Sequence, residues 1–154
     1  MLFDTSPDKY CIYLEGQTVD LNQQLHTYSD IDENVFIQVS PYYVPERSSP
    51  EHQQYFYGYK VEVINHREET IKLVHRHWKI KDGKGKHYEV QGSGVVGEQP
   101  VIAPGEAYEY QSFCPLHSPF GNMRGKFQFI DQYGHRFWVS IPVFFFRPPE
   151  ETLH

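Results

Sequence analysis

The stretch Tyr55-Phe56-Tyr57-Gly58-Tyr59-Lys60-Val61-Glu62-Val63-Ile64 decides the fold class, because its side chains alternate with a period of two. One face carries only tyrosine and valine, at Tyr55, Tyr57, Tyr59, Val61 and Val63. The other face includes the charged residues Lys60 and Glu62. This alternation predicts an antiparallel strand with one face in the core. Stacking of single-stranded bases on the tyrosines is the alternative, and core packing is the interpretation that the alternation favours.

Similar apolar segments follow from Val35 onward, separated by turn-forming residues. Asp82-Gly83-Lys84-Gly85 predicts a hairpin of the Asp-Gly type, and Pro104-Gly105 predicts a further turn. Seven or eight short strands without a long helix predict an all-β fold, an antiparallel β-sandwich. The Cys…Trp…Cys spacing of immunoglobulin domains is absent, which favours the fibronectin type III-like form.

The charge of the chain is unevenly distributed. Residues 1–34 carry seven acidic side chains and one basic side chain, whereas residues 35–154 carry thirteen of each. The formal net charge of −6 therefore belongs to the first 34 residues. We divide the chain into an acidic N-terminal extension (1–34), a sandwich domain (35–149) and a C-terminal tail (150–154). Within the extension, residues 19–26 are expected to form a short helix. The rest of the extension is expected either to dock, with residues 10–14 as an additional strand, or to be mobile.

Composition also bears on partners and compartment. The main part of the chain has no net positive charge, so we expect no nucleic-acid partner. No apolar run approaches the roughly 20 residues of a membrane-spanning helix, and no signal peptide opens the chain. We therefore expect a cytoplasmic protein with no membrane association. Cys11 and Cys114 are expected to be free thiols there, with a disulfide between them as the alternative.

The run Gly92-Ser93-Gly94-Val95-Val96-Gly97-Glu98-Gln99-Pro100 has the pattern G-x-G-x-x-G. A dinucleotide site of that pattern needs a helix after the glycines, and Pro100 and Pro104 prevent one. Three interpretations stay open: a cradle of backbone N–H groups for phosphate, a structural device using positive φ angles, or a loop that contacts a protein partner. The candidate residues of this ligand or partner loop are Gly92, Gly94, Val95, Val96, Gly97 and Gln99.

The segment His75-Arg76-His77-Trp78 could place two histidines on one face of a strand. His75 and His77 are then candidate metal ligands, with a third ligand from elsewhere. In the alternative, one histidine packs in the sheet, Arg76 pairs with a carboxylate and Trp78 fills the core. Cys114 and His117 share a short loop but lack an orienting third group. We expect no catalytic residues, no cofactor and no enzymatic activity.

Residues from about 35 to 147 resemble the ApaG family. The matching pieces, in chain order, are Tyr43–Glu46 with Ser49-Pro50, Tyr59–Asn65, Arg76–Ile80, Asp82-Gly83, Val90–Pro100, Pro104-Gly105, Pro119–Gly125 and Ile141–Phe144. The resemblance implies a fibronectin type III-like sandwich, a protein-binding role, and a link to cobalt resistance and magnesium efflux without an established reaction. It also implies a proposed pyrophosphate or nucleotide site at Gly92, Gly94 and Gly97.

Two function hypotheses follow. The first is a non-enzymatic protein-interaction domain of the ApaG type, connected with cobalt and magnesium homeostasis, whose partner is unidentified. The alternative is a pyrophosphate- or nucleotide-binding module at the Gly92–Gly97 loop, assisted by a metal ion. The run Val143-Phe144-Phe145-Phe146 is apolar on both faces, so the N-terminal extension or a partner chain must cover it. A homodimer is one such arrangement.

Overall fold

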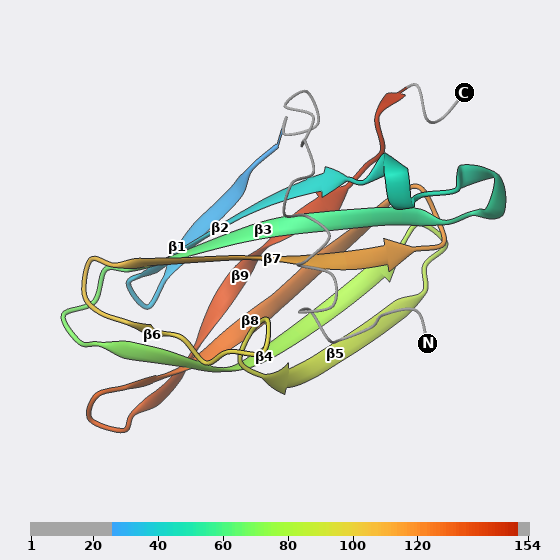
Figure 1. Cartoon of the computed structure of the whole chain (residues 1–154). Helices are drawn as coiled ribbons and strands as arrows, with labels where there is room; N and C mark the ends of the chain where they lie inside the picture. Colours follow the sequence, from blue (N-terminus) through green and yellow to red (C-terminus); the bar gives the residue numbers. More distant parts are fainter. Residues whose placement is uncertain (1–25, 151–154) are drawn as a thin grey trace.

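The computed structural model describes residues 26–150, which form two antiparallel sheets packed face to face (Figure 1). The first sheet has the order β1-β2-β3-β7, and the second has the order β5-β4-β8-β9 with the short β6 also paired to β4. The strands are β1 (Tyr28–Asp32), β2 (Val35–Tyr43), β3 (Tyr55–Asn65), β4 (Ile71–Asp82), β5 (His87–Ser93), β6 (Val101–Ile102), β7 (Ala107–Leu116), β8 (Gly121–Asp131) and β9 (Arg136–Phe146).

The predicted all-β sandwich is therefore confirmed, with nine strands in the described residues rather than seven or eight. β6 has only two residues, too few for a recognisable period. β1 begins at Tyr28, inside the predicted extension, and pairs along its whole length with β2. The helix expected at residues 19–26 and the strand expected at residues 10–14 fall on residues outside the described part, apart from His26. No helix in residues 26–150 is long and apolar enough to cross a membrane.

β3 lies inside the first sheet between β2 and β7, and its alternation is observed as expected. Tyr57, Tyr59, Val61 and Val63 are at most 4% exposed, whereas Lys60 is exposed. Because the tyrosine strip lies in the core, it is not available for stacking bases. At the start of β3 the outer face is covered as well. There the Tyr42 ring lies over Gly58, 2.5 Å from where a Cβ would be.

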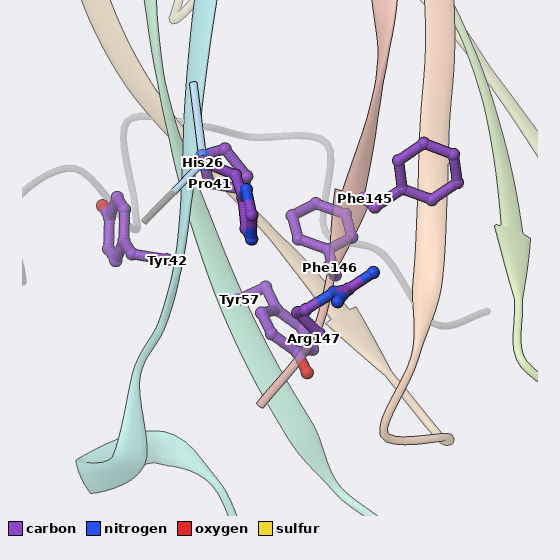
Figure 2. A pocket seen from close by; sticks show the side chains of 7 residues that line it. All are labelled: His26, Pro41, Tyr42, Tyr57, Phe145, Phe146 and Arg147. Atoms are coloured by element: carbon purple, nitrogen blue, oxygen red, sulfur yellow. The ribbon is translucent and has the colours of Figure 1, made fainter. Parts of the chain in front are cut away.

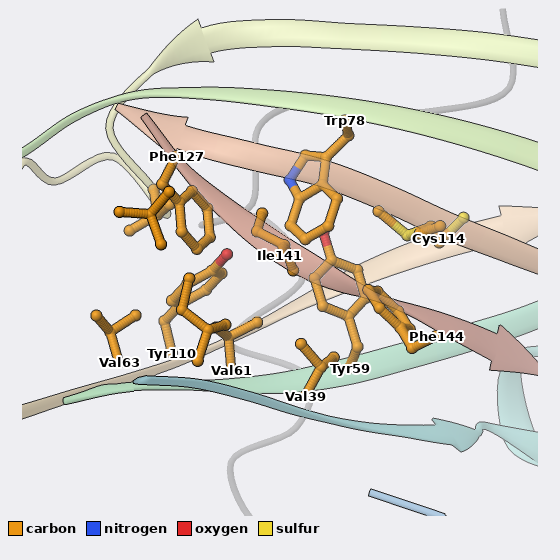
Figure 3. Close-up of a cluster of buried hydrophobic side chains, with 14 of the residues drawn as sticks. Val39, Tyr59, Val61, Val63, Trp78, Tyr110, Cys114, Phe127, Ile141 and Phe144 are labelled. Carbon is orange, nitrogen blue, oxygen red and sulfur yellow. The ribbon is translucent and has the colours of Figure 1, made fainter. Parts of the chain in front are cut away.

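The core between the sheets is rich in aromatic side chains (Figure 3). Trp78 of β4 lies at its centre, with ring centroids 5.6 Å from Tyr59, 5.8 Å from Phe127 and 5.8 Å from Phe144. All three pairs have the edge-to-face geometry that aromatic quadrupoles favour. Burial of these large rings joins strands from both sheets and supplies the main driving force for folding.

Two hairpins in the second sheet use the same turn. Asp82 Oδ1 accepts the N–H groups of Lys84 and Lys86, both at 2.9 Å. Asp131 Oδ1 likewise accepts the N–H groups of Tyr133 and His135, both at 2.9 Å. The predicted hairpin at Asp82 is thus present between β4 and β5, although Gly85 (φ +85°) rather than Gly83 supplies the left-handed residue. Gly134 (φ +87°) has the same position in the second turn.

β1 also connects the two sheets at the edge formed by β9. Asp32 Oδ2 accepts the N–H of Ser140 at 2.9 Å, and the ring centroids of Tyr28 and Phe145 are 6.0 Å apart. Phe144 and Phe146 are buried, whereas Val143 and Phe145 are 36% and 44% exposed. The apolar C-terminal run is therefore covered on its inner face, and β1 contacts part of its outer face.

Candidate functional site

The glycine run lies along one edge of the second sheet. β5 and β6, on either side of the loop, both pair with β4. Both ends of the segment 87–102 therefore lie next to the same strand. Between the two strands the loop projects outward beside an irregularity in β4. The pairing of β4 with β8 shifts there between Leu73 and His75, which leaves Val74 as the extra residue of a β-bulge.

The loop is attached to β4 at this bulge. The carbonyl oxygen of Val74 accepts the N–H of Gly94 and the side-chain amide of Gln99, each at 3.0 Å. The N–H of Leu73 donates to the carbonyl oxygen of Pro100 at 3.0 Å. The two ends of the loop thus supply hydrogen-bond partners for the backbone C=O and N–H groups at the bulge. In this way the loop completes the sheet.

The tip of the loop is a two-residue turn. Val95 and Glu98 exchange backbone hydrogen bonds of 2.8 and 2.9 Å, with Val96 (φ +50°) and Gly97 (φ +73°) between them. Positive φ at both central residues is the type I′ geometry of tight hairpins. Val96 is β-branched, and the left-handed conformation costs about 1–2 kcal/mol there. Val95 is only 1% exposed, and its burial in the core holds the turn in place.

Arg76 holds the loop from the inner side of the sheet. A Cβ on Gly92 would lie 2.9 Å from the guanidinium nitrogens of Arg76, so a larger residue there would displace the end of the Arg76 side chain. The guanidinium donates to the carbonyl oxygens of Ser93 and Gly94, at 2.9 and 3.0 Å. A carboxylate partner for Arg76 was predicted only in the alternative to the metal site, and these hydrogen bonds to the loop were not predicted from the sequence. The register that sets Arg76 opposite Gly92 is the signal that reveals them.

These contacts bear on the three interpretations of the run. The N–H groups of Gly94, Val95 and Glu98 donate within the protein, and the Glu98 carboxylate accepts from the Tyr108 hydroxyl at 3.0 Å. The structural interpretation has the most support, since each glycine permits a turn or a close contact. The side chain of Val95 is in the core and cannot reach a partner. The exposed part of the loop is Gly97, Glu98 and Gln99, continued by Val101, which is 65% exposed.

His75 and His77 both face outward from the second sheet, but each has a different neighbour. The His75 ring is edge-to-face with Trp138 at a centroid distance of 5.9 Å. His77 Nε2 is 3.5 Å from a carboxylate oxygen of Glu89. Across residues 26–150, no three His, Cys, Asp or Glu side chains come together as metal ligands. For the predicted metal site, residues 26–150 thus offer the two candidate ligands His75 and His77 and no third ligand beside them.

Cys114 is buried in the core, and burial raises the pKa of its thiol well above the ordinary value. A neutral, 1% exposed thiol does not act as a nucleophile. The shared loop predicted from the sequence is wrong, because Cys114 lies within β7, which ends at Leu116. His117 follows that strand and is exposed at the surface. The pair therefore does not form a catalytic arrangement.

A small depression near the chain's two described ends is the other candidate (Figure 2). Its lining residues are His26, Pro41, Tyr42, Tyr57, Phe145, Phe146 and Arg147. Its volume of about 20 Å³ has room for roughly one water molecule and is far below the range of about 300–1,000 Å³ usual for ligand pockets. The hydroxyl of Tyr57 donates to the carbonyl oxygen of Pro119 and is thus already used. This depression offers less to a ligand than the loop edge does.

The two sheets and the edge loop define a class: small antiparallel β-sandwiches with a glycine-rich loop attached to a sheet edge. A family model described as the ApaG domain matches residues 45–131. The chain belongs to the ApaG family.

Three similar proteins support this assignment. Protein ApaG from Rhodopseudomonas palustris (strain TIE-1) is 46% identical over 123 residues, covering 80% of this chain and 95% of the relative. Protein ApaG from Methylocella silvestris is 45% identical over 117 residues, covering 76% and 90%. The crystal structure of the ApaA protein from Bordetella pertussis has 41% identity and a TM-score of 0.74, over 80% of this chain and 97% of that one.

Proposed function

We propose that this chain is a non-enzymatic protein-interaction domain of the ApaG type that binds its partner at the glycine-loop edge. This edge consists of β5, the loop Gly94–Pro100 and β6. The observation that carries the proposal is the position of β5. It pairs with β4 on one side, and no other strand within residues 26–150 pairs with its opposite side.

An unpaired strand edge presents backbone N–H and C=O groups to which a partner strand can add. The attachment of the loop at Val74 and Arg76 keeps this edge rigid, so binding costs little ordering entropy. Side chains next to the edge are accessible, notably Gln91, Gln99 and Val101. Together these features suit addition of an extended peptide from a partner.

Site-specific photocrosslinking in cells that make the full-length protein tests this proposal. A photoreactive phenylalanine analogue replaces Gln91 or Val101 at the edge, or Ile31, which is 55% exposed on β1, as the matched control. We expect the analogue at Gln91 and the analogue at Val101 to give the same discrete protein adduct, and the analogue at Ile31 to give none. When Gln91→Pro also blocks the edge in the protein that carries the analogue at Val101, the adduct yield should fall at least fivefold. Adducts of equal yield at all three positions, or none at the edge, would contradict the proposal.

The phosphate-binding alternative has less support, because three N–H groups of the loop donate internally and Glu98 adds negative charge. Amide chemical shifts measured during titration with pyrophosphate, alone and with Mg²⁺ or Co²⁺, distinguish it from the first proposal. Saturable shifts at Gly92, Gly94 and Gly97 at millimolar ligand would favour phosphate binding. The connection with cobalt and magnesium homeostasis and the homodimer both stay predictions.

A further inference from the structure

The outer face of the second sheet, opposite the core, is strongly basic. The cross-strand register places five exposed cations on it: Lys79, Lys81, Arg124, Lys126 and Arg136. β4, β5, β8 and β9 contain three carboxylates, of which Asp82 and Asp131 are buried in their hairpin turns. Glu89 is the third and is exposed on the outer face. We call this surface the basic face; it is the side of β4, β8 and β9 turned away from β3 and β7 (Figure 1).

Two cations of the basic face lie opposite each other on neighbouring strands. Lys79 lies directly opposite Arg124 on the neighbouring strand. Like charges at such cross-strand positions repel each other and destabilise a sheet. An anionic group lying over the face removes that repulsion, so the arrangement indicates an anionic occupant.

The outer face of the first sheet differs in charge. Glu62 lies opposite Glu109, and Lys60 Nζ is 3.4 Å from a Glu109 carboxylate oxygen. The cation there is already paired. The molecule thus separates charge between its two outer faces, and the basic face is the one suited to an acidic segment.

The basic face also has exposed aromatic side chains that such a segment can contact. Trp138 is 37% exposed and lies under the Lys126 ammonium, 4.5 Å from the ring centroid. Phe145, further along β9, is 44% exposed. The occupant should therefore carry both carboxylates and aromatic or aliphatic side chains.

Residues 1–25 of this chain have that composition. They carry four acidic side chains and one basic side chain, together with Phe3, Tyr10, Ile12, Tyr13 and Leu14. The chain continues from them into β1, where Tyr28 contacts Phe145 at the margin of the basic face. An extended chain of 25 residues reaches up to about 80 Å, whereas four strands span only about 15–20 Å. Residues 1–25 are therefore long enough to extend across the basic face.

We infer that residues 1–25 bind across the basic face, where their carboxylates neutralise the opposed cations and their apolar residues cover Trp138 and Phe145. Tethering gives the segment an effective concentration on the order of millimolar, which makes contacts that are individually weak sufficient for binding. The contact is electrostatic in part, so added salt weakens it. The inference concerns a different surface from the loop edge and does not depend on the proposed function.

A spin label on the native Cys11 of the full-length protein tests this inference. Cys11 belongs to the segment, and the other cysteine, Cys114, is 1% exposed with its thiol pKa raised by burial, so labelling is selective. Amide signals of Lys79, Arg124 and Lys126 are expected to lose at least half their intensity through paramagnetic relaxation. Signals of Lys60 and Glu109 on the opposite outer face should keep theirs. In 0.5 M NaCl the difference between the faces should fall at least twofold.

A variant of the full chain with Asp4→Asn, Asp8→Asn, Glu15→Gln and Asp20→Asn should lose the selective broadening. A matched control neutralises four surface acids elsewhere, Glu46→Gln, Glu51→Gln, Glu62→Gln and Glu68→Gln, and should retain it. Trp138 gives a second readout, because the only other tryptophan, Trp78, is 3% exposed. Its quenching by acrylamide should rise about twofold in the first variant only. Equal broadening on both faces, or none on the basic face, overturns the inference.

Discussion

At the scale of single residues, each glycine of the run takes part in a close contact or a tight turn within the protein. Gly92 makes room for the Arg76 guanidinium, and Gly94 has φ +59° where its backbone approaches that of Glu98. Gly97 takes the second left-handed position of the turn. A sequence pattern shared with nucleotide sites thus arises here because backbone and side chains come close together at a sheet edge.

Replacement of Gly94 by alanine should destabilise the protein more than the same change at Gly105. Both residues have positive φ, so the left-handed backbone costs each alanine about 1–2 kcal/mol. A Cβ on residue 94 would also collide with the Glu98 carbonyl oxygen, whereas one on residue 105 has no heavy atom within 4 Å. We expect Gly94→Ala to cost roughly 1–3 kcal/mol more than Gly105→Ala in urea unfolding. Equal costs would show that the loop relaxes freely.

At the scale of elements, turn chemistry and strand irregularity position the candidate site. The β-bulge at Val74 creates the acceptor to which the loop attaches, and the two Asp-capped hairpins set the ends of β4, β5, β8 and β9. Repeated use of one turn keeps these strands in register. A register shift by one residue would move the basic face into the core.

The turn at Asp131 gives a prediction about pH. Hydrogen bonds from the N–H of His135 and then of Tyr133, with the charges of His135 and Arg67 adding to them, lower the pKa of Asp131 below its ordinary 3.8. Because the folded-state pKa is the lower one, the carboxylate stabilises the fold above about pH 4, and this stabilisation is lost as pH falls through the folded-state value.

The measurement is urea unfolding of the wild type and Asp131→Asn between pH 7 and pH 2.5. We expect the wild type to be the more stable at pH 7 and the difference to narrow as the pH falls toward 2.5. Glu46→Gln, at an exposed carboxylate, serves as the control and should show no such pH-dependent difference. A constant difference between wild type and Asp131→Asn over the whole range would contradict the assignment.

At the scale of the whole molecule, the two sheets differ at their edges and on their outer faces. One edge of the second sheet is closed by β1 and Asp32, and the opposite edge, at β5, is unpaired within residues 26–150. One outer face is basic and the other contains paired charges. The two proposals therefore concern two separate surfaces, the β5 edge and the basic face.

Removal of the Asp32 carboxylate should loosen the closed edge. Asp32→Ala leaves the N–H of Ser140 without its acceptor, so we expect a loss of about 1 kcal/mol in unfolding free energy. Hydrogen exchange of the Ser140 amide should accelerate. Asp30→Ala, two residues earlier on β1, should leave that exchange rate unchanged, since Asp30 accepts from Ile31 within its own strand. Equal exchange in the two variants would argue against closure by Asp32.

The fold class, the main strands and the hairpin at Asp82 could be predicted from the sequence. They depend on periodicity and turn chemistry within a few consecutive residues, as in Tyr55–Ile64. The family was indicated by the resemblance of motifs spread over residues 35–147. Three features could not be predicted from the sequence: β1 closes the edge at β9, Arg76 hydrogen-bonds to the loop beside Gly92, and Val95 is buried while Val101 is exposed. The physical reason is that these features depend on which strands become neighbours and in what register. That choice is made by packing between residues distant in the chain, and neither Ser140 nor Asp32 carries a local sign of it.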